Sequence, residues 1–264
     1  MSDTINCPNC QAVIPAGNKF CGSCGQKLSG DGSQAKKAKT MYFGAQELQM
    51  PGKAKLILIK GSGQDGTTYY LNGKEHIIGR TDGQIQPEKP DPFLSPRHAN
   101  FFYDDNKLFV KDENSVNGVF ARIKGSINIQ AGDVFMLGQQ LFRLDTIDEP
   151  EELAPEEDGT YFYATPQMPA SFILVRVLQG GIEGDIYRAE ENVITIGRES
   201  NTVNFPSDPF ISGNHARIEL KSEGFVLTDL NSSNGTFFKI RDEKQLSSGD
   251  FIFVGQQLFR VEIN

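Results

Sequence analysis

Short runs of apolar residues, separated by turns rich in Gly, Asn and Asp, make up most of the chain after residue 53. Lys55–Lys60 begins one block of such runs, and Phe172–Val177 begins a second block. Runs of about four to eight apolar or alternating residues, bounded by turn residues, are typical of β-strands. The spacing of apolar residues supports no convincing helix. The pattern therefore predicts an all-β protein built from β-sandwiches.

The second block repeats the first at the size of a domain. His98 and His215 lie 117 residues apart, and so do Asn117 and Asn234. A repeat of this length is a duplicated domain and not a solenoid, whose units are about 20–50 residues long. We therefore predict two tandem sandwiches. They are expected at 54–146 and 171–264, with a flexible linker at 29–53 before the first and an acidic linker at 147–170 between them.

Three short polar motifs recur in the same order in both blocks. The first block has Gly79-Arg80, Ser95-Pro-Arg-His98 and Asn117-Gly118; the second has Gly197-Arg198, Ser212-Gly-Asn-His215 and Asn234-Gly235-Thr236. Arg is a permanent cation whose planar fork matches the oxygens of a phosphate. Ser can donate its hydroxyl to the same phosphate, and Asn can donate to and accept from an extended peptide backbone. The three residue types together suit the capture of one phosphoryl group on a peptide.

These motifs resemble those of the forkhead-associated (FHA) family, and the resemblance covers roughly residues 54–146 and 171–264. It implies a non-catalytic adaptor that binds phosphothreonine peptides in Ser/Thr kinase signalling, as bacterial FHA proteins do. The partners it implies are Thr-phosphorylated proteins and a Ser/Thr protein kinase. It assigns peptide contact to Arg80, Ser95, Asn117, Arg198, Ser212 and Asn234. It assigns support of the binding loops to Gly79, His98, Gly118, Gly197, His215, Gly235 and Thr236.

The two motif sets are not identical. The second set keeps Asn-Gly-Thr in full and has Ser233 before the Asn, whereas the first has Val119 in place of the Thr and Val116 in place of that Ser. The first set also carries Arg97 beside the ligand loop. We therefore expect the first site to be weaker or differently selective.

All four cysteines lie before residue 25, in two Cys-x-x-Cys turns. Such turns point paired thiolates at one tetrahedral ion. We predict that residues 5–28 form a zinc ribbon in which Cys7, Cys10, Cys21 and Cys24 hold one structural Zn²⁺. A redox dithiol and a rubredoxin-like iron site remain as alternatives. The ribbon could serve nucleic-acid binding, protein docking or capping, and the sequence does not choose among these roles.

The chain is acidic, with a net charge of −8 and a pI near 5.0. This balance disfavours nucleic acid and anionic membranes as general partners, because both require clustered cations. No apolar run approaches the roughly 20 residues of a membrane span. The first residues lack the features of a signal peptide, and the cysteine distribution is unlike that of a disulfide-stapled secreted protein. A cytoplasmic location is expected.

Each linker contains a Thr with aromatic residues just after it: Thr40 in Thr-Met-Tyr-Phe and Thr160 in Thr-Tyr-Phe-Tyr. One interpretation is a solvated tether whose aromatics pack loosely on a neighbouring domain. The other is that Thr40 or Thr160 is phosphorylated and becomes a ligand for an FHA site. A flexible tether of about 14 residues spans roughly 20 Å, so phospho-Thr40 could reach the first site within the same chain and act as a switch.

Other functions fit parts of the sequence. A nucleic-acid-associated regulator could read its target with the zinc ribbon, although only Lys19 and Lys27 supply cations there. A phospho-independent FHA scaffold is a second alternative. Gly61-Ser-Gly-Gln-Asp-Gly66 matches a dinucleotide-binding pattern, but a strand follows it where a helix is needed. Ser212 lies outside any Gly-x-Ser-x-Gly nucleophile elbow, and no P-loop is present, so we do not expect an enzyme.

Overall fold

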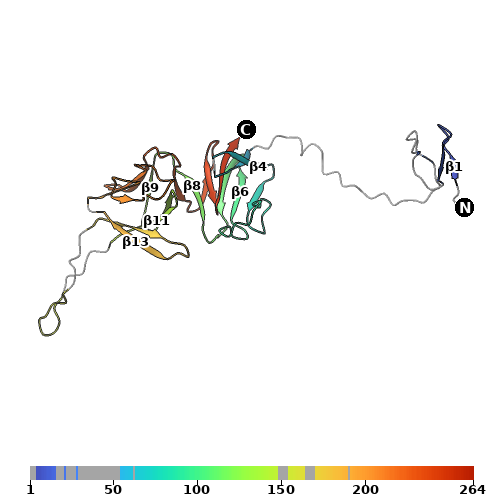
Figure 1. Cartoon of the computed structure of the whole chain (residues 1–264). Helices are drawn as coiled ribbons and strands as arrows, with labels where there is room; N and C mark the ends of the chain where they lie inside the picture. Colours follow the sequence, from blue (N-terminus) through green and yellow to red (C-terminus); the bar gives the residue numbers. More distant parts are fainter. Residues whose placement is uncertain are drawn as a thin grey trace. The chain divides into compact units, whose positions relative to one another are not determined.

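The computed structural model describes residues 4–15, 21, 28, 54–61, 63–147, 154–163, 170–189 and 191–264. All regular elements in these residues are strands, which confirms the all-β prediction for the described part of the chain (Figure 1). That part contains no helix with the length and apolarity needed to cross a membrane. The chain divides into two compact units, residues 1–50 and 51–264. The predicted flexible linker at 29–53 lies outside the described residues.

The described residues of the first unit form an antiparallel hairpin of β1 (Thr4–Asn6) and β2 (Val13–Pro15). The turn between them is closed by two hydrogen bonds, from Cys7 N to Ala12 O (3.0 Å) and from Gln11 N to Cys7 O (2.9 Å). The hairpin places Cys7 and Cys10 on one short turn. The bounds 5–28 of the predicted ribbon stay a prediction, because most residues after position 15 of this unit are not described.

Both sequence blocks fold into strands in the second unit. The first block contributes β3 (Ala54–Ile59), β4 (Asp65–Leu71), β5 (Glu75–Ile78), β6 (Ala99–Asp104), β7 (Lys107–Asp112), β8 (Val119–Arg122), β9 (Ser126–Ile129), β10 (Val134–Leu137) and β11 (Gln140–Asp145). The second contributes β12 (Ile173–Val177), β13 (Glu183–Arg188), β14 (Val193–Gly197), β15 (Val203–Asn204), β16 (Ala216–Lys221), β17 (Gly224–Asp229), β18 (Thr236–Lys239), β19 (Glu243–Gln245), β20 (Phe251–Val254) and β21 (Gln257–Ile263).

The final strands of each block pair with strands of the other block. β9 pairs with β17, β10 with β18 and β11 with β12. Conversely, β19 pairs with β7, β20 with β8 and β21 with β3. The first sandwich therefore consists of β3–β8 together with β19–β21, and the second sandwich consists of β12–β18 together with β9–β11. The two blocks have exchanged their last three strands.

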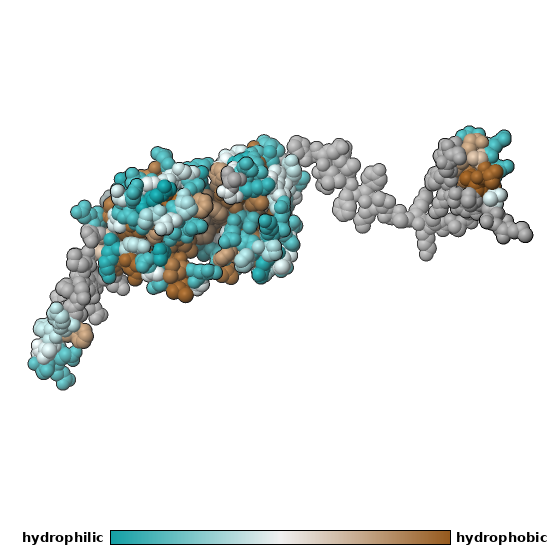
Figure 2. Space-filling model, in the orientation of Figure 1, coloured by the Kyte–Doolittle hydropathy of each residue, from teal (hydrophilic) through white to brown (hydrophobic). Residues whose placement is uncertain are grey.

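One sheet runs through both sandwiches, in the order β13-β12-β11-β10-β18-β8-β20-β21-β3-β4. The antiparallel pair β8–β18 is where the two sandwiches meet in this sheet. A four-stranded sheet, β19-β7-β6-β5, forms the other layer of the first sandwich, and a five-stranded sheet, β15-β14-β16-β17-β9, forms that of the second. Each pair of layers encloses its own apolar core. The face of the second unit that Figure 2 shows is mostly hydrophilic, with some apolar patches.

This division differs from the contiguous segments 54–146 and 171–264 that the duplication predicts. The physical reason is that the exchanged strands fill the two cores almost identically: Phe142 and Leu144 are fully buried in one core, and Phe259 and Val261 occupy the equivalent positions of the other. Core packing of this kind gives similar free energy in either arrangement, because it depends on volume and apolar area. A repeat in the sequence therefore defines the duplicated blocks. It does not determine which block supplies the last three strands of each sandwich.

The acidic segment 147–170 also has a different setting from the one its position suggests. It connects β11 to β12, and these strands are direct neighbours in the second sandwich, with Asp145 opposite Ile173. The segment is therefore a loop of the second sandwich and does not connect one sandwich to the other. The connections between sandwiches are the short segments 123–125, after β8, and 240–242, after β18.

Two buried aspartates fix the exchanged hairpins onto the receiving block. Asp91 is 2% exposed and its Oδ2 accepts hydrogen bonds from Gln256 N and Gln257 Nε2, both at 2.8 Å. Asp208 does the same for the other hairpin, accepting from Gln139 N at 2.8 Å and Gln140 Nε2 at 2.9 Å. A buried carboxylate is stable only when such donors satisfy it. These bonds therefore hold each exchanged hairpin in one position.

Candidate functional site

The arginine of each Gly-Arg motif lies on the turn that follows β5 or β14, against the serine loop. Arg80 N donates to Ser95 O (2.9 Å), and Arg198 N donates to Ser212 O (3.0 Å). A Cβ atom on Gly79 would lie 2.0 Å from Pro96 O. No side chain fits at that distance, so glycine is required for this close approach. The equivalent Gly197 has the same close approach to a backbone carbonyl, at 2.0 Å.

The serine of each site is joined to the asparagine turn. Ser95 Oγ accepts a hydrogen bond from Val116 N (3.1 Å), and Ser212 Oγ accepts one from Ser233 N (3.1 Å). A hydroxyl has one proton to donate as well as lone pairs to accept. Since the loop uses only the oxygen as acceptor in this bond, the proton is available for an oxygen of a ligand.

The histidines are buried behind the serine loops. His98 is fully buried; its Nδ1 accepts from Ser95 N (3.1 Å), so the proton lies on Nε2, which donates to Gly118 O (3.0 Å). His215 holds the second site in the same way, between Ser212 N (3.1 Å) and Gly235 O (3.2 Å). Each histidine thus ties the serine loop to the Asn-Gly turn, which is the supporting role that the resemblance implies.

The asparagines stand at the exposed rim of the sites. Asn117 Nδ2 donates to Phe93 O (2.8 Å), and Asn234 Nδ2 donates to Phe210 O (2.8 Å). These bonds fix the amide group and leave its carbonyl oxygen to accept from a peptide N–H. The glycines that follow, Gly118 and Gly235, have φ values of +80° and +86°, a region that favours glycine.

A further pair of residues supports each asparagine turn and was missed by the sequence analysis. Ser115 N donates to Asp112 Oδ2 (3.0 Å), and Ser115 Oγ accepts from Gly118 N (2.8 Å). Asp229 and Ser232 repeat this arrangement in the second site. The signal was available, because Asp-x-x-Ser occurs in both blocks at the same offset from the Asn-Gly motif.

Thr236 adds one more bond to the second turn. Its Oγ1 donates to Asp229 Oδ2 (2.8 Å), and the first site has Val119 at the equivalent position. Burial acts to raise the pKa of Asp229, but hydrogen bonds from Ser232 and Thr236 outweigh it, so that the pKa lies below its ordinary value. The second turn is therefore held by one more side-chain hydrogen bond than the first.

The two arginines are exposed, and neither guanidinium pairs with a carboxylate of the described residues. Arg198 Nε and Nη2 donate to the carbonyl of Ile211, at 3.1 and 2.8 Å, which aligns this side chain along the serine loop. Arg80 has no side-chain hydrogen bond in the part of the chain that the structure describes, and neither arginine forms an ion pair there. Arg97, in contrast, is paired with Glu113 (3.0 Å). Both candidate anchors thus keep their charge available for an anion.

Acidification should destabilise the second sandwich through His215. Burial lowers the pKa of His215 below its ordinary value near 6.5. The imidazole is therefore protonated more readily in the unfolded chain than in the folded one. The stabilisation from the neutral ring is therefore complete above about pH 6.5 and declines as the pH falls toward the folded pKa. We expect the Tm of the protein to decrease when the pH is lowered from 7.5 to 5.5. The decrease should be smaller in His215→Gln. Glu223→Gln, at an exposed turn, is the control; an equal loss in both variants would contradict this account.

The cysteine residues of the first unit lie close together where they are described. The Sγ atoms of Cys7, Cys10 and Cys21 all lie within 4.8 Å of one another, and those of Cys10 and Cys21 are 3.6 Å apart. Four thiolates around a tetrahedral Zn²⁺ at about 2.3 Å would be separated by roughly 3.8 Å. The three thiols therefore fit as ligands of one metal ion. Cys24 lies outside the described residues.

The candidate phosphorylation sites differ in what the structure shows. Thr160 is exposed, and its backbone N–H donates to Asp158 Oδ1 (2.9 Å) within a turn of the β11–β12 loop. The aromatic residues after it are also exposed: Phe162 is 83% and Tyr163 98% accessible. Packing of these two side chains on a neighbouring domain is therefore not observed. Thr40 lies outside the described residues.

The fold and the loops together define a class: all-β modules in which an arginine, a serine and an asparagine stand on adjoining loops. The family model described as "FHA domain" matches the chain twice, over residues 76–138 and 194–255. The two matches carry all three motifs of each block and support the FHA family for both. The resemblance seen in the sequence is confirmed to that extent.

Several known proteins are similar to parts of the chain. The oxoglutarate dehydrogenase inhibitor of Corynebacterium diphtheriae is 29% identical over 133 residues, which cover 50% of this chain and 92% of that protein. The glycogen accumulation regulator GarA of Mycolicibacterium smegmatis is 27% identical over 131 residues, covering 48% of this chain and 82% of that protein. The names of these relatives describe an inhibitor and a regulator.

Solved structures also align with parts of the chain. One, described as an analysis of phosphothreonine-dependent FHA domain interactions, is 16% identical with a TM-score of 0.31, and the match covers 80% of this chain and 96% of that one. Mycobacterium tuberculosis EmbR in complex with a low-affinity phosphopeptide is 23% identical with a TM-score of 0.21, covering 42% of this chain and 27% of that one. The fold described above rests on the strand pairing and not on these alignments.

Proposed function

We propose that the chain is a regulator that binds phosphothreonine peptides at two sites. In this assignment Arg80, Ser95 and Asn117 form the first site, and Arg198, Ser212 and Asn234 form the second. The observation that supports it best is common to both: the arginine turn and the asparagine turn are each hydrogen-bonded to the same serine. In addition, no carboxylate in the described part of the chain neutralises the guanidinium. A cation, a hydroxyl and an amide thereby stand on adjoining loops, and we assign the position between them to the phosphate.

The chemistry of a phosphothreonine matches this position. The phosphate carries up to two negative charges and three acceptor oxygens, which suit the fork of Arg and the hydroxyl of Ser. Recognition of threonine over serine needs a contact with its methyl group, which is worth about 0.8 kcal/mol when buried. The relatives support a regulatory role, because they are named as an inhibitor and a regulator. Thr-phosphorylated proteins and a Ser/Thr protein kinase are the partners that such a role implies.

The test is a library of phosphothreonine peptides, applied to the full chain beside the same peptides without phosphate. We expect saturable binding to the phosphorylated set only, and release of the captured peptide when a phosphatase removes the phosphate. A phosphoserine version of the best peptide should bind several-fold more weakly. Equal capture of phosphorylated and unmodified peptides would instead indicate a phospho-independent scaffold.

The Thr residues of the two linkers extend this proposal. Thr160 is exposed in a loop of the second sandwich, and Thr40 precedes the first sandwich in the sequence. If a kinase modifies either residue, the phosphothreonine becomes a ligand at high effective concentration within the same chain. Intramolecular binding would then close a site to external partners. The cytoplasmic location expected from the sequence is consistent with such signalling and stays a prediction.

The cysteines of the first unit support a structural metal. We assign Cys7, Cys10 and Cys21, together with Cys24 from the sequence, as ligands of one Zn²⁺ ion. Four thiolates complete a tetrahedral ion and leave no open position for catalysis. The small size of this unit means that metal binding would supply much of its folding free energy.

A further inference from the structure

The strand exchange brings one cation from each block beside the Asn-Gly turn of the other block. Arg122 and Lys239 occupy equivalent positions in the two blocks, 117 residues apart, and lie at the ends of β8 and β18. In the antiparallel pair formed by these strands, Arg122 is opposite Phe237 and Lys239 is opposite Phe120. The Arg122 side chain can therefore extend along β18 toward the turn before that strand, and the Lys239 side chain can extend along β8 toward the turn before β8.

The contacts at the two turns are close. A Cβ atom on Gly118 would lie 2.2 Å from Lys239 Cε and 3.0 Å from its Nζ. A Cβ atom on Gly235 would lie 2.1 Å from Arg122 Nε and 2.8 Å from its Cζ. The glycines leave room for these side chains as well as adopting the left-handed conformation. Lys239 thus lies against Gly118, the residue that follows Asn117 of the first site. Arg122 lies against Gly235, the residue that follows Asn234 of the second.

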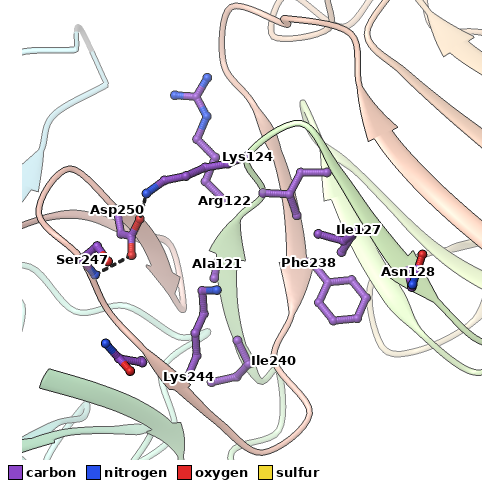
Figure 3. A pocket seen from close by; sticks show the side chains of 12 residues that line it. Ala121, Arg122, Lys124, Ile127, Asn128, Phe238, Ile240, Lys244, Ser247 and Asp250 are labelled. Carbon is purple, nitrogen blue, oxygen red and sulfur yellow. Dashed lines mark hydrogen bonds and ion pairs between the residues drawn. The ribbon is translucent and has the colours of Figure 1, made fainter. Parts of the chain in front are cut away.

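Both cations are available to a ligand. The side chains of Arg122 and Lys239 form no hydrogen bond or ion pair among the residues that the structure describes. The Arg122 guanidinium lies over the ring of Phe251, at 5.6 Å. The cations two positions further along the chain are instead neutralised: Lys124 pairs with Asp250 at 2.6 Å, and Arg241 pairs with Asp133. Figure 3 shows Lys124 turned toward Asp250, while Arg122 extends away from this pair.

The charge of Arg122 also reaches the second site. Burial is the main cause of the lowered pKa of His215, and the positive charge of Arg122 acts in the same direction. His215 is the residue that holds the Ser212 loop to Gly235. Because Arg122 also lies against Gly235, it is positioned to act on an anionic peptide bound across the same loops.

We propose that each phosphopeptide site is completed by a cation from the opposite block, Lys239 at the first site and Arg122 at the second, and that both sites therefore favour peptides with acidic residues near the phosphothreonine. The inference rests on the proposed function. An extended peptide advances about 3.3 Å per residue, so residues within two or three positions of the phosphothreonine pass over the Asn-Gly turn and its cation. The specificity of one site thus depends on a residue that its own block does not supply.

The test uses the full chain and isolates one site at a time. Arg198→Ala leaves the first site to bind, and Arg80→Ala leaves the second. Each background is titrated with two phosphothreonine peptides that carry Glu or Gln at the three positions on either side. Lys239→Met and Arg122→Met remove the charge but keep an unbranched apolar stem. Lys244→Met removes a nearby cation on β19, where it is opposite Val110 of β7, and is the control.

We expect the parent to prefer the Glu peptide by about fivefold, the effect of one partly exposed ion pair. Lys239→Met should remove this preference at the first site and leave the second unchanged, and Arg122→Met should do the reverse. Unchanged preferences, or a loss at the site of the same block, would overturn the crossed assignment while phosphate-dependent binding persists. Absence of phosphate-dependent binding in the parent and both backgrounds would instead reject the proposed function, and this inference with it.

Discussion

Arg198→Ala is expected to reduce the affinity of the second site for a phosphothreonine peptide by at least about 100-fold. The guanidinium fork can make two charge-assisted hydrogen bonds to the phosphate, each worth about 1.5–3 kcal/mol. Because Arg198 is aligned along the serine loop by the carbonyl of Ile211, little further ordering is needed on binding. Isothermal titration of the full chain should show one binding event fewer than the parent. Arg80→Ala combined with Arg198→Ala should abolish binding.

Two variants separate the loss of the fork from a general loss of charge. Arg198→Lys keeps one positive charge without the planar fork, and we expect an intermediate affinity. Arg217→Ala removes an arginine that pairs with Glu219 on β16 (3.1 Å) and is not one of the assigned contact residues, so it should bind as the parent does. If Arg198→Ala bound phosphopeptide with the parental stoichiometry and affinity, the anchor role of this residue would be wrong.

The strand exchange predicts which engineered disulfide can form. Lys55 lies opposite Glu262 in the β3–β21 pair, and their side chains form an ion pair at 2.7 Å. We expect Lys55→Cys with Glu262→Cys to be cross-linked in nearly all molecules under oxidising conditions, and to gain about 2–4 kcal/mol of stability. Peptide mapping by mass spectrometry distinguishes this bond from any that involve the native cysteines.

The matched control places the second cysteine at the equivalent position of the other block. Asp145 corresponds to Glu262 in the repeat and lies opposite Ile173 in the second sandwich. Lys55→Cys with Asp145→Cys should therefore stay reduced. A reversed outcome, with residues 55 and 145 linked and residues 55 and 262 unlinked, would show that each block completes its own sandwich.

The sequence was sufficient to predict the strands and the residues that the sites bring together. Alternation of apolar and polar residues indicated the strands, and the motifs Gly-Arg, Ser-x-x-His and Asn-Gly located the loops, because each requires a specific backbone or hydrogen-bond geometry. The structure places Arg80 against Ser95 and Arg198 against Ser212, as these motifs suggest. The supporting Asp112 and Ser115 escaped notice, although their repeat in the second block was visible in the sequence.

The sequence could not predict the partner of each exchanged strand. Phe142 and Phe259 are buried in equivalent surroundings, so hydrophobic pattern alone fits either arrangement. What distinguishes the two arrangements is the path of the short segments after β8 and β18 and the contacts made where these strands pair. Such contacts involve Arg122 and Lys239 and depend on three-dimensional geometry that a one-dimensional pattern does not encode.

The neighbouring positions of β3 and β21 have a mechanical consequence. Ala54 lies opposite Ile263, so the first and last strands of the second unit have their outer termini side by side, at the same end of the β3–β21 pair. Tension applied to residues 54 and 264 would break the hydrogen bonds of this pair one after another. This requires a lower force than a shearing geometry, in which all the hydrogen bonds are loaded at once. The second sandwich would carry no load until the first had opened. Pulling on the chain would therefore disable its two halves in a fixed order.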